Sequence, residues 1–132
     1  FAVSVCCIAF APSGDLLAAT GADGQARLWN IQTGEALLCV AGHQDVATGV
    51  AFAADGQCIA TCSSDGTAVL WNIESGCREA TLEGHSEAVM AATFVCKSDL
   101  APTPTKTKFC NYNRRPGCNC QNCNGNGVVA AQ

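Results

Sequence analysis

The chain repeats itself at an interval of 42 residues. Trp29-Asn30-Ile31 recurs as Trp71-Asn72-Ile73, and a second group of landmarks keeps the same offset without a gap. This group consists of glycines, aspartates and phenylalanines: Gly14 and Gly56, Asp23-Gly24 and Asp65-Gly66, Gly34 and Gly76, and Phe10, Phe52 and Phe94. A repeat of this length is typical of chains that build a row of similar structural units, each of which covers the next.

Each copy has the features of four short strands separated by turns. In the second copy we predict strands at 46–53, 58–63, 68–72 and 77–83, because Asp-Gly and Ser-Gly pairs separate the apolar stretches there. Glycine adopts positive φ at no steric cost and aspartate tolerates tight turns, so these pairs favour hairpins. No segment has the i, i+3, i+4 apolar spacing of a long amphipathic helix. The sequence therefore predicts an all-β chain.

Two dipeptides narrow the kind of repeat. Gly-His pairs begin at Gly42 and Gly84, early in the second and third copies, and Trp-Asn pairs begin at Trp29 and Trp71, late in the first and second copies. Up to about residue 95 the chain resembles the WD-repeat family, with Asn in place of the family's usual Asp after each Trp. The resemblance implies a fragment of a β-propeller, whose four-stranded antiparallel blades pack around a central channel. The implied units are blade one at 1–41, blade two at 42–83 and the first strand of blade three at 84–95.

The resemblance also implies a buried chain of hydrogen bonds in each blade, made by Asp, His, a hydroxyl residue and Trp. In blade two the matching residues are Asp65, His43, Thr61 and Trp71. A buried carboxylate needs such partners, and a network whose members are all satisfied makes its blade rigid.

Blade one departs from this pattern. Ala19 stands in place of the hydroxyl residue and Phe1 in place of the histidine, so only Asp23 and Trp29 remain of the network. We therefore expect blade one to be the looser of the two. In blade three, His85 takes the position of the histidine.

A basic segment interrupts blade three. Residues 96–127 are rich in Cys, Asn and Pro and carry 5 basic and 1 acidic side chains, whereas residues 1–95 carry 2 basic and 10 acidic ones. We predict that 96–127 form a disordered insertion and that 128–132 begin the next strand of blade three, with Val128 aligned to Leu16. An unrelated C-terminal tail, such as one from a misread gene model, is the alternative.

Two kinds of site are conceivable in the insertion. Cys110, Cys118, Cys120 and Cys123 supply four thiolates, the number that a structural zinc site uses, but only the last two have the usual spacing. The lysines and arginines beside two aromatic residues could contact RNA or an acidic partner. We predict exposed thiols and a solvated basic loop instead, with no metal ion, no cofactor and no nucleic acid bound.

The sequence predicts a protein-binding scaffold and no enzyme. Both histidines stand in Gly-His pairs, and catalytic triads, phosphate-binding glycine loops and paired carboxylates are not detectable. The expected partners are other proteins or peptides, and the acidic loops at one end of the blades favour basic ones. The alternatives are a regulatory part of a larger multidomain protein with catalysis elsewhere, and a metal- or nucleic-acid-binding insertion. The loop residues expected to face partners are Gln44, Asp45, Ser63, Ser64, Ser86 and Glu87.

We expect the chain to act in the cytoplasm as part of a longer protein. It begins at Phe1, and the remaining blades of the same parent chain are its expected neighbours. No apolar run approaches the roughly 18 residues that a membrane helix needs, so no membrane contact is predicted. Cysteines scattered through strand-like stretches are typical of small buried residues in a reducing, cytoplasmic compartment.

Overall fold

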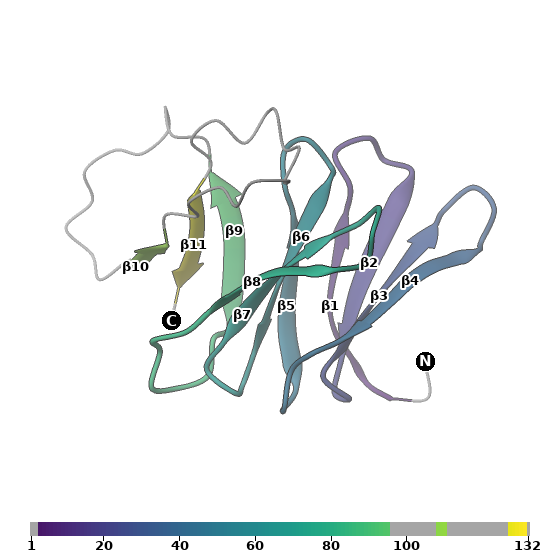
Figure 1. Cartoon of the computed structure of the whole chain (residues 1–132). Helices are drawn as coiled ribbons and strands as arrows, with labels where there is room; N and C mark the ends of the chain where they lie inside the picture. Colours follow the sequence, from purple (N-terminus) through teal and green to yellow (C-terminus); the bar gives the residue numbers. More distant parts are fainter. Residues whose placement is uncertain (1–2, 96–107, 111–126, 132) are drawn as a thin grey trace.

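The computed structural model describes residues 3–95, 108–110 and 127–131 (Figure 1). These residues form eleven strands and no helix, which confirms the all-β prediction. The strands belong to three antiparallel sheets. The innermost strands of the three sheets, β1, β5 and β9, lie side by side (Figure 1).

The first two sheets have the same topology, in which each strand pairs with the next along the chain. The first sheet, blade one, contains β1 (Val5–Phe10), β2 (Leu16–Gly21), β3 (Gln25–Asn30) and β4 (Ala36–Ala41). The second sheet, blade two, contains β5 (Ala47–Phe52), β6 (Cys58–Ser63), β7 (Ala68–Asn72) and β8 (Arg78–Leu82). The strands predicted at 58–63 and 68–72 have these same bounds, whereas β5 and β8 are shorter than predicted. The four-stranded antiparallel blades are confirmed.

The Asp-Gly turns hold neighbouring blades together. Gly24 and Gly66 have φ values of 73° and 85°, which side chains with a Cβ rarely adopt. A Cβ atom at Gly24 would lie 2.8 Å from the backbone oxygen of Asp45, and one at Gly66 would lie 3.0 Å from that of His85. Each turn therefore packs against the loop that leads into the following sheet, and a larger residue would push the two apart.

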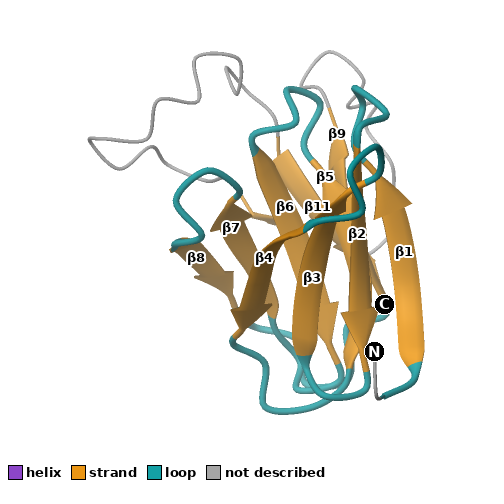
Figure 2. Cartoon of the chain, turned by 90° about the vertical axis from the view of Figure 1, so that its right-hand side faces the viewer, coloured by secondary structure: helices purple, strands orange, loops and turns teal. Residues whose placement is uncertain are grey.

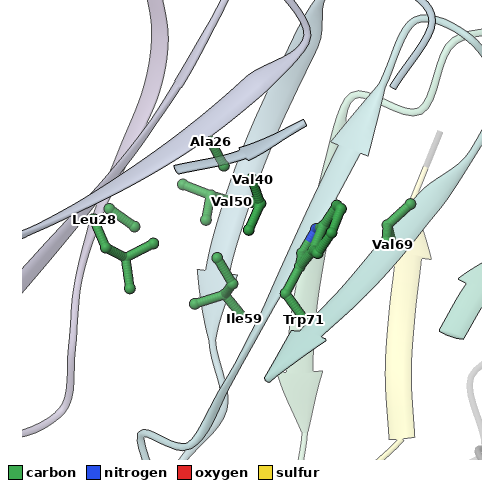
Figure 3. Close-up of a cluster of buried hydrophobic side chains, with 8 residues drawn as sticks. Ala26, Leu28, Val40, Val50, Ile59, Val69 and Trp71 are labelled. Atoms are coloured by element: carbon green, nitrogen blue, oxygen red, sulfur yellow. The ribbon is translucent and has the colours of Figure 1, made fainter. Parts of the chain in front are cut away.

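The main core lies between the first two sheets. Leu28 of β3 and Val40 of β4 share one buried cluster with Ile59 of β6 and Trp71 of β7 (Figure 3). The other members are smaller side chains from the same two sheets: Ala18, Ala26, Val50 and Val69. Since successive side chains of a strand point to opposite faces, each sheet gives only one face to this cluster.

The two blades differ in how far they are covered. Val50 on β5 is 7% exposed, whereas Ile8, at the same position of β1, is 57% exposed. Blade two has blade one on one face and β9 (Ala91–Val95) on the other, where Val89 is fully buried. Blade one keeps an apolar face open, on which Phe10 is 62% exposed. In blade two the corresponding face is the one that blade one covers.

The third sheet includes a strand that the sequence did not predict. Its strand order is β10-β11-β9, with β11 at Gly127–Ala131 and β10 at Lys108–Cys110. The prediction of disorder throughout 96–127 is wrong at Lys108–Cys110, a strand too short to show alternation that pairs with β11, and at Gly127, which begins β11. Residues 96–107 and 111–126 of that segment lie outside the described residues.

The position of β11 differs by one residue from the alignment of the repeats. Val128 lies opposite Phe94, whereas in the complete blades the corresponding phenylalanine lies opposite Leu17 or Ile59. Val128 thus corresponds to Leu17, and its alignment with Leu16 is wrong. Both residues belong to apolar runs, so the sequence similarity does not fix the register, which strand pairing sets.

Candidate functional site

In blade two the four residues of the predicted network form one continuous chain of hydrogen bonds. The indole Nε1–H of Trp71 donates to the hydroxyl of Thr61 at 2.9 Å, and this hydroxyl lies 2.8 Å from Nε2 of His43. On the other side of the imidazole ring, Nδ1 lies 3.3 Å from Oδ2 of Asp65. Trp71 and Thr61 belong to β7 and β6, and the other two residues to loops. The network therefore ties the centre of the sheet to the loops at its end.

The carboxylate sets the direction of the hydrogen bonds in this chain. Ionised Asp65 only accepts, so Nδ1 of His43 carries the proton and Nε2 accepts from the Thr61 hydroxyl. The oxygen of Thr61 in turn accepts from Trp71. Thr61 is 1% exposed and Trp71 is 5% exposed, so a polar group here that loses its partner cannot turn to water instead.

Asp65 also holds the loop that precedes β5. Its Oδ2 accepts the backbone N–H of Gln44 at 2.9 Å, and its Oδ1 accepts the N–H of Thr67 at 2.9 Å and the hydroxyl of Thr67 at 2.6 Å. Burial raises the pKa of Asp65, but these hydrogen bonds and the nearby His43 outweigh burial and bring the pKa to about 2. The carboxylate therefore stays ionised at neutral pH.

We expect the protein to lose stability as the pH falls below 6.5, the ordinary pKa of a histidine. Burial of the His43 side chain, which is 2% exposed, lowers its pKa and outweighs the opposing effect of Asp65. Below pH 6.5 the unfolded chain therefore binds a proton that the folded chain does not. The stability that comes from neutral, buried His43 is complete above pH 6.5 and is lost below it. Urea unfolding midpoints between about pH 7.5 and about pH 5.5 measure the loss.

The matched control for this pH dependence is His43→Gln, which should have a flatter profile over the same range. Asp65 does not contribute there, because its carboxyl group is ionised throughout. A midpoint that rises toward pH 5.5 in the unmodified chain would contradict a buried, neutral His43.

Blade one has a different arrangement at the same positions. Asp23 forms an ion pair with Arg27 at 2.8 Å, and this hydrogen bond lowers the pKa of Asp23. Arg27 stands where Val69 stands in blade two, and its long side chain reaches back four residues to the carboxylate. Trp29 is half-buried. Asp23 therefore pairs with an arginine, where its counterpart in blade two pairs with a histidine.

Most residues predicted to face partners are exposed at one end of the sheets. They lie in the loop that precedes β5 and the loop that precedes β9, and the exposed ones are Gln44, Asp45, Ser86 and Glu87. Ser64, in the turn between β6 and β7, is half-buried, as is His85. Backbone hydrogen bonds fix these loops: the Ser64 N–H donates to the carbonyl oxygen of Val46, and the Val89 N–H donates to that of Ser63.

The prediction that Ser63 faces partners is wrong, because this residue is 0% exposed. Its hydroxyl donates to the backbone oxygen of Asp45 at 3.2 Å and accepts the N–H of Asp65 at 3.1 Å. The sequence places Ser63 beside a turn but does not show that its short polar side chain folds back onto the backbone.

Arg78 contributes to this region and was not predicted from the sequence. Its guanidinium group lies 5.4 Å from the centre of the Trp71 ring, which is a cation–π distance. A Cβ atom at Gly42 would lie 2.7 Å from the same ring, which explains the glycine of the Gly-His pair. One feature of the sequence could have pointed to Arg78: it is one of only 2 basic side chains in residues 1–95.

A cavity of about 280 Å³ opens beside Arg78 and is lined by Gly42, Gln44, Asp65, Thr67, Thr81 and Glu83.

The described residues hold no group of three or more His, Cys, Asp or Glu side chains that could bind a metal ion. Of the cysteines considered as ligands, Cys118, Cys120 and Cys123 lie outside the described residues, and only the backbone of Cys110 is described. Across the described part of the chain, no helix has the length and apolar character to cross a bilayer.

Comparisons with known proteins relate the chain to one repeat family. The family model "WD domain, G-beta repeat" matches residues 2–30 and 34–72, more than half of the chain. The solved structures "Structure of U3-55K" and "Crystal structure of RRP9 WD40 repeats" are each similar with a TM-score of 0.67 and 20% sequence identity. Each match covers 70% of this chain and 30% of the other, so the chain spans less than a third of these proteins. No curated protein sequence matches the chain.

The second matched stretch shows how the sequence repeat relates to the blades. Residues 34–72 contain β4 of blade one together with β5, β6 and β7 of blade two. One sequence repeat therefore supplies the outer strand of one sheet and the three inner strands of the next, which links the two sheets covalently.

Proposed function

Since the chain belongs to the WD-repeat family of β-propellers, we propose that it is a non-catalytic scaffold that binds other proteins. The binding surface is the pair of loops that precede β5 and β9, with Gln44, Asp45, Ser86 and Glu87 exposed. The observation that carries the proposal is the hydrogen bond from the Gln44 N–H to the buried network through Asp65. A loop fixed in this way loses little conformational entropy when a partner binds.

The charge of the surface supports a basic partner. Residues 3–95 carry 10 acidic and 2 basic side chains, and Asp45 and Glu87 are exposed in the two loops. Charges of one sign attract an oppositely charged partner and raise its rate of association. The preferred ligand is therefore a peptide or a protein surface rich in Lys and Arg.

Two features support a non-catalytic role in the cytoplasm. His43 is committed to hydrogen bonds inside blade two, which leaves it unsuited to catalysis as a base. The six described cysteines Cys6, Cys7, Cys39, Cys58, Cys62 and Cys77 are all free thiols, which suits a reducing compartment.

A charge-reversal experiment tests the proposed surface. We expect Asp45→Lys combined with Glu87→Lys to weaken binding to a panel of Lys- and Arg-rich peptides by about tenfold or more, because the attraction becomes a repulsion. The matched control combines Glu74→Lys with Ala54→Lys and Gln57→Lys, which makes the same total change of charge at exposed turn positions at the opposite end of blade two. Fluorescence anisotropy of the labelled peptides measures the affinities.

The controls decide between this surface and a general charge effect. Equal weakening by the Asp45→Lys, Glu87→Lys variant and by the control variant would assign binding to net charge alone. Equal affinity of the unmodified chain for acidic and basic peptides would contradict the proposed partner chemistry.

A further inference from the structure

The outer strand of blade one is an uncharged, apolar sheet edge. β4 has the sequence Ala-Leu-Leu-Cys-Val-Ala and, among the strands that the structure describes, pairs with β3 alone (Figure 2). Leu37 is 51% exposed, and Ala36, Cys39 and Ala41 are exposed as well. Alternate residues of an antiparallel edge strand direct their N–H and C=O groups away from the sheet, so β4 offers unpaired backbone groups beside apolar side chains.

The corresponding strand of blade two is protected. β8 has the sequence Arg-Glu-Ala-Thr-Leu and carries two charged side chains, Arg78 and Glu79. Glu79 stands at the repeat position of Leu37, and Thr81 and Glu83 stand at those of Cys39 and Ala41. Charged side chains on an edge strand are a common defence against pairing with another chain. Blade one lacks this defence at the same positions.

The exposure of β4 does not depend on the open face of blade one. Thr81 and Glu83 are exposed in blade two even though blade one packs against that face. The inner strands of the two sheets are in contact, whereas Thr81 and Glu83 line the cavity beside Arg78 on the outer strand β8. A further sheet packed against blade one would therefore leave Cys39 and Ala41 accessible in the same way.

We propose that β4 is a docking edge to which an extended segment of another protein adds as a fifth strand. Backbone hydrogen bonds would supply the affinity, and alternate apolar side chains of the segment would contact Leu37 and Cys39. This edge is separate from the loops at the end of the sheets. The inference extends the proposed protein-binding role but involves none of the same residues.

Charge distinguishes the partner from a second copy of this chain. Glu35 is exposed immediately before β4, and residues 3–95 carry 10 acidic against 2 basic side chains. Two copies joined at β4 would bring these negative charges together, whereas a segment with basic residues at its ends would be attracted. The partner is therefore an extended apolar segment flanked by Lys or Arg.

The test uses the full chain and a short synthetic peptide with alternating Val and Thr between terminal lysines. We expect the peptide to bind and to slow amide hydrogen exchange in β4 but not in β8, as read by NMR. Cys39→Lys should weaken binding by about tenfold or more, because it places a positive charge on the edge. Thr81→Lys, the same change at the matching position of β8, should leave the affinity unchanged.

Four outcomes would overturn the proposal: no binding of the peptide, protection outside β4, equal affinity of Cys39→Lys and the unmodified chain, or equal binding of a peptide with terminal glutamates. Sedimentation that shows paired copies, separated by Cys39→Lys, would assign the edge to a second copy instead. If Cys39→Lys does not fold, the exchange pattern of the unmodified chain decides. The Asp45→Lys, Glu87→Lys variant should still bind the Val- and Thr-containing peptide at β4. Its binding therefore distinguishes a failure of the β4 proposal from a failure of the proposed loop surface.

Discussion

Replacement of Trp71 by alanine should lower the free energy of unfolding by about 3–5 kcal/mol. Trp71 is 5% exposed, its side chain packs with Leu28 and Ile59 in the core between the blades, and the Arg78 guanidinium group lies over its ring. Its removal leaves a cavity between two sheets that cannot close without moving the core. It also removes the N–H donor to Thr61. Chemical denaturation of the variant and the unmodified chain measures the difference.

Trp29→Ala is the matched control for this loss. Trp29 occupies the same repeat position but is half-buried, on the face of blade one that none of the described sheets covers. Its removal should cost distinctly less than that of Trp71, because water already reaches part of the ring. Equal losses at the two positions, or an unfolding midpoint unchanged by Trp71→Ala, would contradict the assignment of Trp71 to a buried network.

Thr61→Val should lower the free energy of unfolding by about 2–4 kcal/mol, although the two side chains have nearly the same shape. The hydroxyl accepts from Trp71 and donates to His43, so its loss leaves two buried polar groups without their partner. Each such group costs about 1–3 kcal/mol. The nearly constant volume means that the loss reports hydrogen bonding and not packing.

Thr81→Val provides the comparison, since Thr81 is an exposed residue on β8. This change should leave stability within about 0.5 kcal/mol of the unmodified chain. If Thr61→Val were equally mild, the chain of hydrogen bonds through Thr61 would have no energetic role and the network would not hold blade two together.

The sequence predicted most of the fold because its landmarks are tied to backbone geometry. Gly24 and Gly66 need positive φ and leave no room for a Cβ atom, so their recurrence marks the same turn in both blades. The apolar stretches between such turns then give strands whose bounds follow closely, as in β6 and β7. The family match, through residue 72, confirms the resemblance on which the blade architecture was predicted.

The rest depended on long-range contacts that a repeat alignment does not contain. Arg27 stands where blade two has a valine, and its long side chain reaches back to Asp23 in the turn before β3. Ser63 turns inward onto backbone groups of two loops. Arg78 stacks on a tryptophan from a neighbouring strand. In each case the spacing of the repeat shows where the residue stands, but not which partner its side chain finds.

The central claim is that the recurring Gly-His, Asp-Gly and Trp residues work as one hydrogen-bonded unit that fixes blade two and its loops. A double-mutant cycle between Thr61→Val and Trp71→Ala tests it most directly. We predict that the double variant loses less stability than the sum of the single losses, by about 1 kcal/mol or more, because either change alone already breaks their shared hydrogen bond. Losses that simply add would show that the two residues act independently and would contradict the claim.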